Sequence, residues 1–127
     1  MNPLFEPEQM EPGTVNVAQL VEDLDEDSML SFLGIFLEQM PTLLKELATG
    51  VVLEENERIR ETAHEIKGSS AYIGATRLLW LAWAMEQYAC DGEIPPCRQI
   101  LGELSKEYRR VENNLSRILN IRLPIAA

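Results

Sequence analysis

The chain has a single histidine, His64, and the residues that follow it could support phosphoryl chemistry. Lys67 comes three residues later, a spacing that makes side chains neighbours on a helix. An imidazole with an unperturbed pKa of about 6.5 is mostly neutral and nucleophilic near pH 7. A nearby ammonium offsets negative charge. The pair therefore predicts an imidazole that attacks phosphorus and forms a labile P–N bond, with Lys67 balancing the charge of the acquired group.

Nothing in the sequence supplies the phosphate itself. The sequence contains no GxxxxGK[ST] loop, no GxGxxG kinase loop and no obvious aspartate cluster arranged to hold Mg²⁺. Nor does spacing identify a second acid–base group or an oxyanion donor that would point to an independent enzyme. We therefore expect the phosphoryl donor to be another protein, and this chain to be a carrier without kinase activity or a cofactor of its own.

Helical periodicity places His64 on the solvent side of its helix. At 100° per residue, His64, Gly68 and Ala71 lie opposite a stripe that is expected to be buried. That stripe consists of Ile59, Ala63, Ile66, Ser70 and Ile73. Glycine inside a helix lowers its stability by about 1 kcal/mol relative to alanine, so the presence of Gly68 indicates a compensating function. Gly68 and Ala71 leave a bare strip beside His64, which another macromolecule could approach closely.

The elements that must position these residues all have helical periodicity. Amphipathic helices are predicted at about residues 15–25, 27–49, 54–73, 76–91 and 97–121. Pro41 predicts a kink in the second of these helices, or two stacked pieces. Gly50 is expected to end that helix and Gly74 the third. Gly92 and the pair Pro95–Pro96 are expected to stop the fourth.

The predicted fold is all-α. No segment shows the alternating pattern of a strand, and the short connections at 50–53, 74–76 and 92–96 favour antiparallel neighbours. We therefore predict an antiparallel up-down four-helix bundle with a short extra helix at its N-terminal end. The expected organisation is a flexible N-terminal arm at 1–14, a bundle domain at 15–122 and a short C-terminal tail at 123–127.

Composition excludes several classes of function. A chain of 127 residues with a net charge of −10 is a single domain that repels phosphate backbones and anionic lipid, so nucleic acid and membrane surfaces are not expected partners. No apolar run approaches the roughly 20 residues that span a bilayer. Two cysteines and one histidine are too few for a Cys/His zinc site, so no metal is expected. Free thiols and the acidic N-terminus favour the cytoplasm.

The stretch from His64 to Ala75, HEIKGSSAYIGA, resembles the H-x-x-K-G-[SA]-[SA]-x-x-[LIV]-G-[AL] signature of histidine-containing phosphotransfer (HPt) domains. The KGSS version is similar to free-standing fungal and plant members, and the resemblance extends more loosely over about residues 15–120. It implies a phosphorelay intermediate. Such a protein accepts phosphate from an aspartate in a receiver domain of a hybrid histidine kinase and passes it to the receiver domain of a response regulator, with Mg²⁺ held only by the receiver.

The resemblance also implies roles for individual residues. His64 would be the phosphoacceptor through Nε2, Lys67 the charge-stabilising side chain, and Gly68 the clearance for a docking receiver. Ser69 and Ser70 would help to pack and position the helix.

One position departs from the family pattern. Many members have a glutamine 22 residues after the phosphoacceptor, where it can hydrogen-bond the imidazole or the phosphate; here that position is Glu86, and Gln87 follows. A carboxylate facing His64 would orient the ring but repel a phosphoryl group. A shift of one residue in register would bring Gln87 to His64 instead. The sequence leaves both arrangements open.

The second helix has more apolar residues than its core stripe needs. Ile35 lies on the far side of that stripe and Phe32 near its edge, and the short first helix could cover part of this patch through Leu20 and Leu24. Exposed apolar surface marks a partner site. The predicted docking surface consists of Gly68, Ser69, Ala71, Phe32 and Ile35. A monomer is expected. The alternative function is a helical adaptor that binds partner proteins through the same face and is not phosphorylated.

Overall fold

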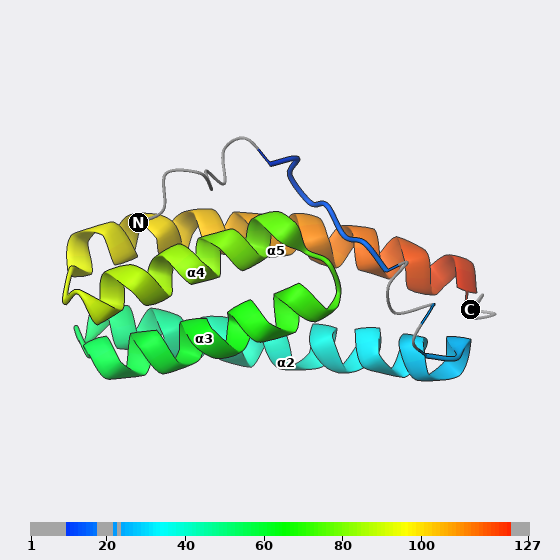
Figure 1. Ribbon diagram of the computed structural model, residues 1–127, viewed down its shortest axis with the longest axis horizontal. Coiled ribbons are helices and arrows are strands. Elements are labelled where there is room, and N and C mark those ends of the chain that lie inside the picture. Colours follow the sequence, from blue (N-terminus) through cyan, green and yellow to red (C-terminus); the bar gives the residue numbers. More distant parts are fainter. Residues whose placement is uncertain (1–9, 18–21, 23, 123–127) are drawn as a thin grey trace.

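The computed structural model describes residues 10–17, 22 and 24–122, with side chains as far as residue 120. In the described part of the chain, four helices run side by side along the long axis of the molecule (Figure 1). They are α2 (Glu26–Val52), α3 (Asn56–Tyr72), α4 (Thr76–Cys90) and α5 (Ile94–Arg122). Each packs against the next along the chain, and α5 closes the ring against α2. This arrangement confirms the predicted antiparallel four-helix bundle.

The core lies between the four helices and contains the residues that the periodicity assigned to it. On α3, Ile59, Ala63, Ile66 and Ser70 are completely buried, as is Ile73 immediately after the helix. In the part of the chain that is described, no helix combines the length and apolar character needed to cross a membrane. Most of the predicted helix at 15–25 lies outside the described residues. Residues 15–17 are not helical, so the predicted start of that helix at residue 15 is wrong.

Helix α2 passes through Pro41 as one continuous helix, so the alternative of two stacked pieces is wrong. Proline has no N–H to donate to the carbonyl four residues earlier, which here belongs to Leu37. The hydroxyl of Tyr108 on α5 donates to that carbonyl at 3.4 Å. Burial raises the pKa of Tyr108 to about 12, and this keeps the hydroxyl protonated as a donor. A side chain from α5 thus satisfies the acceptor that Pro41 leaves free.

Three helices end in the same motif, in which a residue with positive φ allows two hydrogen bonds back to the last turn. Gly74 (φ 70°) has this role after α3 and Gly92 (φ 72°) after α4, as predicted. After α2 the residue is Glu54 (φ 56°). Gly50 lies inside α2, where an added Cβ would come within 3.2 Å of Ile59. The prediction that Gly50 ends the helix is therefore wrong, and its small size serves the close packing of α2 against α3.

The last helix begins earlier than predicted. Helix α5 starts at Ile94 and includes Pro95 and Pro96 in its first turn. Proline is tolerated there because the first N–H groups of a helix have no partner within the helix. The connection from α4 is therefore shorter than the predicted link at 92–96.

Residues 10–14, predicted as part of a flexible arm, are packed against α4 and α5. The N–H of Gly13 donates to the fully buried carboxylate of Glu107 at 2.7 Å, and Asn114 donates to the carbonyl of Gly13 at 2.6 Å. Arg110 also reaches Glu107, at 3.2 Å. A buried carboxylate needs such partners, so this part of the chain belongs to the folded domain. Residues 1–9 and 123–127 lie outside the described part.

The same segment continues to the turn between α3 and α4. Arg77 donates to the carbonyl of Met10 at 3.0 Å, and the N–H of Asn16 donates to the carbonyl of Ile73 at 3.2 Å. An added Cβ on Gly74 would lie 2.5 Å from the carbonyl oxygen of Asn16. Glycine is therefore required at position 74 both by its positive φ and by this close contact.

We predict that Glu54→Gly stabilises the protein by about 0.5–1 kcal/mol, because a residue with a Cβ is strained in the left-handed region. The substitution also removes the exposed ion pair between Glu54 and Arg98, whose contribution is small. Urea unfolding measures the difference. The matched control is Glu61→Gly on the exposed face of α3, where glycine should instead cost about 1 kcal/mol. A loss of stability in Glu54→Gly comparable to that in the control contradicts this explanation of the helix end.

Candidate functional site

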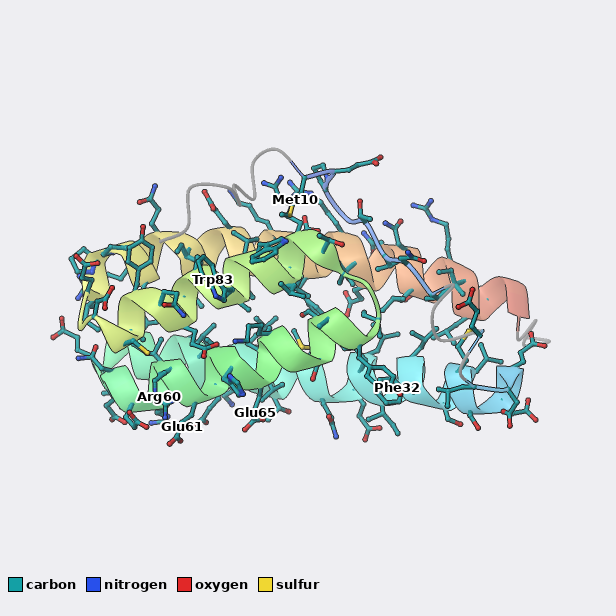
Figure 2. All side chains as sticks on the ribbon, viewed as in Figure 1. Met10, Phe32, Arg60, Glu61, Glu65 and Trp83 are labelled. Atoms are coloured by element: carbon teal, nitrogen blue, oxygen red, sulfur yellow. The ribbon has the colours of Figure 1, made fainter. Side chains whose placement is uncertain are left out.

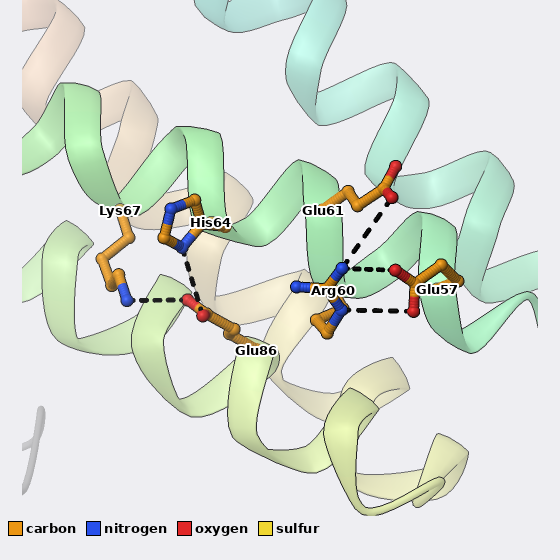
Figure 3. Close-up of polar contacts among 6 residues, drawn as sticks. All are labelled: Glu57, Arg60, Glu61, His64, Lys67 and Glu86. Carbon is orange, nitrogen blue, oxygen red and sulfur yellow. Dashed lines mark hydrogen bonds and ion pairs between the residues drawn. The ribbon is translucent and has the colours of Figure 1, made fainter.

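The imidazole of His64 projects from α3 into solvent, with 63% of its side-chain surface exposed. Its position confirms the orientation predicted from the helical periodicity. Lys67 lies one turn further along the same helix and is less exposed, at 26% of its side chain. Figure 3 shows the two side chains reaching toward a common acceptor on α4.

That acceptor is the carboxylate of Glu86. Nδ1 of His64 lies 3.2 Å from its Oε1, and the Nζ of Lys67 lies 2.9 Å from its Oε2. The contact with His64 is thus made by Glu86 and not by Gln87, which decides between the two registers left open by the sequence. Among the described residues, the imidazole of His64 has no other hydrogen bond or ion pair. Nδ1 is therefore the occupied ring nitrogen, and Nε2 is the one available to a partner.

Glu86 is an ionised carboxylate in a largely buried position, with 12% of its side chain exposed. Burial by itself raises the pKa of a carboxyl group. Here hydrogen bonds from Lys67 and His64, together with their charges, outweigh burial and hold the pKa of Glu86 below its ordinary value of 4.5. At neutral pH, Glu86 is therefore negatively charged and can only accept hydrogen bonds.

A second cation on α3 is already neutralised by its own helix. Arg60, one turn before His64, forms ion pairs with Glu57 and with Glu61, the latter at 3.8 Å (Figure 3). Lys67 is therefore the cation whose partner, Glu86, also contacts the imidazole.

The strip beside His64 is open, as predicted. An added Cβ on Gly68 would meet no atom within 4 Å, and Ala71 is exposed next to it. Ser69 is partly exposed, whereas Ser70 is completely buried in the core. The backbone of α3 is thus accessible along one face for the length of about two turns, starting at the imidazole.

An apolar surface adjoins this strip. Phe32 of α2, labelled in Figure 2, stacks on Tyr72 at the end of α3 with ring centroids 4.2 Å apart. Tyr72 and Ile35 are both exposed. Leu24 packs against the core, whereas Leu20 lies outside the described residues. Tyr72 was not among the residues predicted for this surface, although its position four residues after Gly68 places it on the same helix face.

We predict that Lys67→Met raises the pKa of Glu86, because burial then loses its strongest opposing partner. A carbon-detected NMR titration of the Glu86 carboxyl group measures this value in both proteins. In the wild type, the pKa of Glu86 is lower in the folded state than in the unfolded state. Ionised Glu86 therefore stabilises the fold fully above about pH 4.5, and this contribution is lost as the pH falls through the folded-state pKa. An unchanged Glu86 titration in Lys67→Met contradicts this account of the site.

Comparison with known proteins identifies the fold and the family. The sequence model of the Hpt domain family matches residues 31–114 of this chain. Histidine-containing phosphotransfer protein 1 of Arabidopsis thaliana is 21% identical over 115 residues, which cover 89% of this chain and 75% of that protein.

Two solved structures have the same fold. Histidine-containing phosphotransfer protein B (HptB) of Pseudomonas aeruginosa PAO1 superposes with a TM-score of 0.75 at 23% identity, covering 80% of this chain and 88% of that one. The HPT domain of a sensor hybrid histidine kinase from Shewanella gives a TM-score of 0.69 at 19% identity, covering 87% and 92%. The chain therefore belongs to the Hpt domain family of phosphorelay intermediates in two-component signalling.

Proposed function

We propose that His64 is the phosphoacceptor of this relay and that its Nε2 carries the phosphoryl group. The observation that carries the proposal is the arrangement of the chain's one imidazole: it is exposed to solvent, held at Nδ1 by Glu86, and next to Lys67 and an open helix face. The donor is an aspartyl phosphate in the receiver domain of a hybrid histidine kinase. The acceptor is an aspartate in the receiver domain of a response regulator.

In the proposed reaction, the Nε2 lone pair attacks phosphorus while the bond from phosphorus to the aspartate oxygen breaks, and the aspartate leaves as a carboxylate. The second transfer is the same step reversed on another receiver. Lys67 offsets the negative charge that the phosphoryl group brings. The chain acts as a carrier without kinase activity, and Mg²⁺ is held by the receiver, so no cofactor is assigned to this chain.

The receiver would dock on the face that surrounds His64. Gly68 and Ala71 let it approach the helix backbone, and Phe32, Ile35 and Tyr72 supply an apolar centre for the contact. A contact of standard to small size suits a relay, because the partner must be released after each transfer. One copy of the chain is enough for this reaction. The free thiols of Cys90 and Cys97 fit a reducing compartment such as the cytoplasm.

We predict that His64→Gln abolishes phosphorylation while leaving the fold intact, because the side chain is exposed. The protein is incubated with a receiver domain phosphorylated by acetyl phosphate and Mg²⁺. The wild type should then acquire a label that is labile in acid and stable in base. Glu65→Gln, an exposed neighbour on the same helix, is the matched control and should still be labelled. Label that persists in His64→Gln refutes the assignment, and an unlabelled wild type that still binds the receiver identifies a helical adaptor instead.

We predict that Gly68→Gln slows transfer from the phosphorylated receiver by at least about tenfold, because the added side chain keeps the reacting atoms apart. The fold should gain up to about 1 kcal/mol, since glycine is a poor helix former and the added Cβ has open space. Transfer reactions quenched at timed intervals measure the rate, and urea unfolding measures the free energy of unfolding. Gly102→Gln, at a similarly open helical position on α5, is the control and should transfer normally. Normal transfer by Gly68→Gln would show that the strip is not a docking surface.

A further inference from the structure

We infer that a groove between α2 and α3, next to the proposed docking surface, takes a lysine or arginine side chain of the receiver. Glu38 on α2 and Glu65 on α3 would bind its positive charge. The inference rests on the proposed function and extends it, because it states which chemical feature a receiver needs in order to dock on this chain.

The groove has a volume of about 380 Å³ and is lined by Glu38, Gln39, Thr42 and Leu43 of α2 and by Glu65 of α3. Both glutamates are exposed, whereas Leu43 is partly buried and packs against the core. The lining thus combines two carboxylates and two uncharged polar side chains with one apolar side chain. This composition suits a long side chain with an apolar stem and a positively charged end.

The groove continues the apolar part of the docking surface along the two helices. Phe32 of α2, labelled in Figure 2, stacks on Tyr72 of α3. Because α2 and α3 are antiparallel, the residues that follow Phe32 on α2 lie beside those that precede Tyr72 on α3. Glu38 follows Phe32 on α2 and Glu65 precedes Tyr72 on α3, each by about two helical turns. The two glutamates therefore face the same seam as the stacked rings, further along it.

A receiver that reaches His64 across Gly68 also covers Glu65. At 100° per residue, His64 lies about 40° to one side of Gly68 around α3, and Glu65 lies about 60° to the other side. Glu65 shares the groove with residues of α2, whereas His64 lies on the side of α4, where it contacts Glu86. The open backbone at Gly68 is thus between the imidazole and the groove, and a partner seated on it would exclude water from both.

The glutamates of the groove are not neutralised within the described part of the chain. Neither Glu38 nor Glu65 forms an ion pair there, whereas the α3 cations Arg58 and Arg60 are paired with other glutamates. A carboxylate that loses its water without gaining a cation is strongly destabilising. Docking therefore favours a receiver with a lysine or arginine opposite the groove, and it disfavours one with an apolar or acidic side chain there.

A basic side chain suits the groove better than a metal ion does. Two carboxylates are fewer protein ligands than a dedicated calcium site has. Among the described residues, no group of three or more histidine, cysteine, aspartate or glutamate side chains could hold a metal ion. The groove instead adjoins a surface that is proposed to bind a protein, and a positive side chain of that protein complements its charge.

The first test measures how tightly charge variants bind the unphosphorylated form of the receiver domain that labels His64. Glu38→Gln/Glu65→Gln should raise the Kd about five- to tenfold at about 50 mM salt, because two charge-assisted contacts become neutral. The ratio of this Kd to that of the wild type should shrink toward one at about 0.5 M salt, where screening weakens the attraction between charges. Isothermal titration calorimetry measures the Kd at both salt concentrations.

Asp91→Asn/Glu103→Gln is the matched control. It removes the same net charge from exposed positions after α4 and on α5, away from the docking surface, and should match the wild type. Urea unfolding checks that both double variants fold. An unchanged Kd in Glu38→Gln/Glu65→Gln, or an equal rise in the control, overturns the inference.

Labelling separates this inference from the proposed function. With the receiver in excess of its Kd, the wild type and both double variants should be labelled, because the imidazole contacts Glu86 and neither groove glutamate. A wild type that takes no label on His64 overturns the proposed function itself. A labelled wild type whose binding does not depend on Glu38 and Glu65 overturns the inference alone.

The second test identifies the cation of the receiver. Glu38→Lys/Glu65→Lys should raise the Kd more than the glutamine variant does, since like charges then face each other. Each exposed lysine and arginine of the receiver is changed to glutamate in turn. One of these receiver variants should bind the wild type more weakly and restore binding to the lysine variant. If none of them restores binding, the inference is wrong.

Discussion

A buried carboxylate cannot stay ionised without partners, and Glu86 finds both of its partners on the neighbouring helix. His64 and Lys67 are one helical turn apart on α3, and each contacts one oxygen of the same carboxyl group on α4. Ile66 and Met85, the sequence neighbours of this trio on the two helices, are completely buried in the core. The packing of α3 against α4 therefore sets the distance between carboxylate and imidazole, and a solvent-exposed ring acquires an orientation that surface side chains ordinarily lack.

The connection between these two helices is held from outside the bundle. Asn16 donates to the carbonyl of Ile73, and its own carbonyl and side chain fill the space where a Cβ on Gly74 would lie. The same N-terminal segment is anchored on the buried carboxylate of Glu107 through Gly13. The segment thus restrains the turn that determines how α3 and α4 lie relative to one another. Contacts far from His64 in the sequence contribute in this way to the geometry of the site.

The features predicted correctly from the sequence are those that depend on local periodicity and on glycine. The exposure of His64, the buried face of α3 and the helix ends at Gly74 and Gly92 all follow from spacing along one segment. Two of the errors have long-range causes. Pro41 remains within α2 because Tyr108 donates to the carbonyl of Leu37, 71 positions earlier in the chain, which the proline leaves free. Residues 10–14 are packed because Gly13 contacts Glu107, which is 94 positions away.

The choice between Glu86 and Gln87 depends on about 100° of rotation of α4, which only packing decides. Its outcome bears on how a carrier can both accept and release phosphate. A site with several free cations would hold the phosphoryl group tightly and return it slowly. Here the ammonium of Lys67 is paired with Glu86, which also contacts the imidazole, so in the proposed relay the site would offer one ammonium to the phosphoryl group and one carboxylate to the ring. In the proposed relay, Lys67 can pair with Glu86 again once the phosphoryl group has left. We therefore expect the ion pair of Lys67 with Glu86 to compete with the phosphoryl group for the ammonium and to limit the stability of the phosphorylated state.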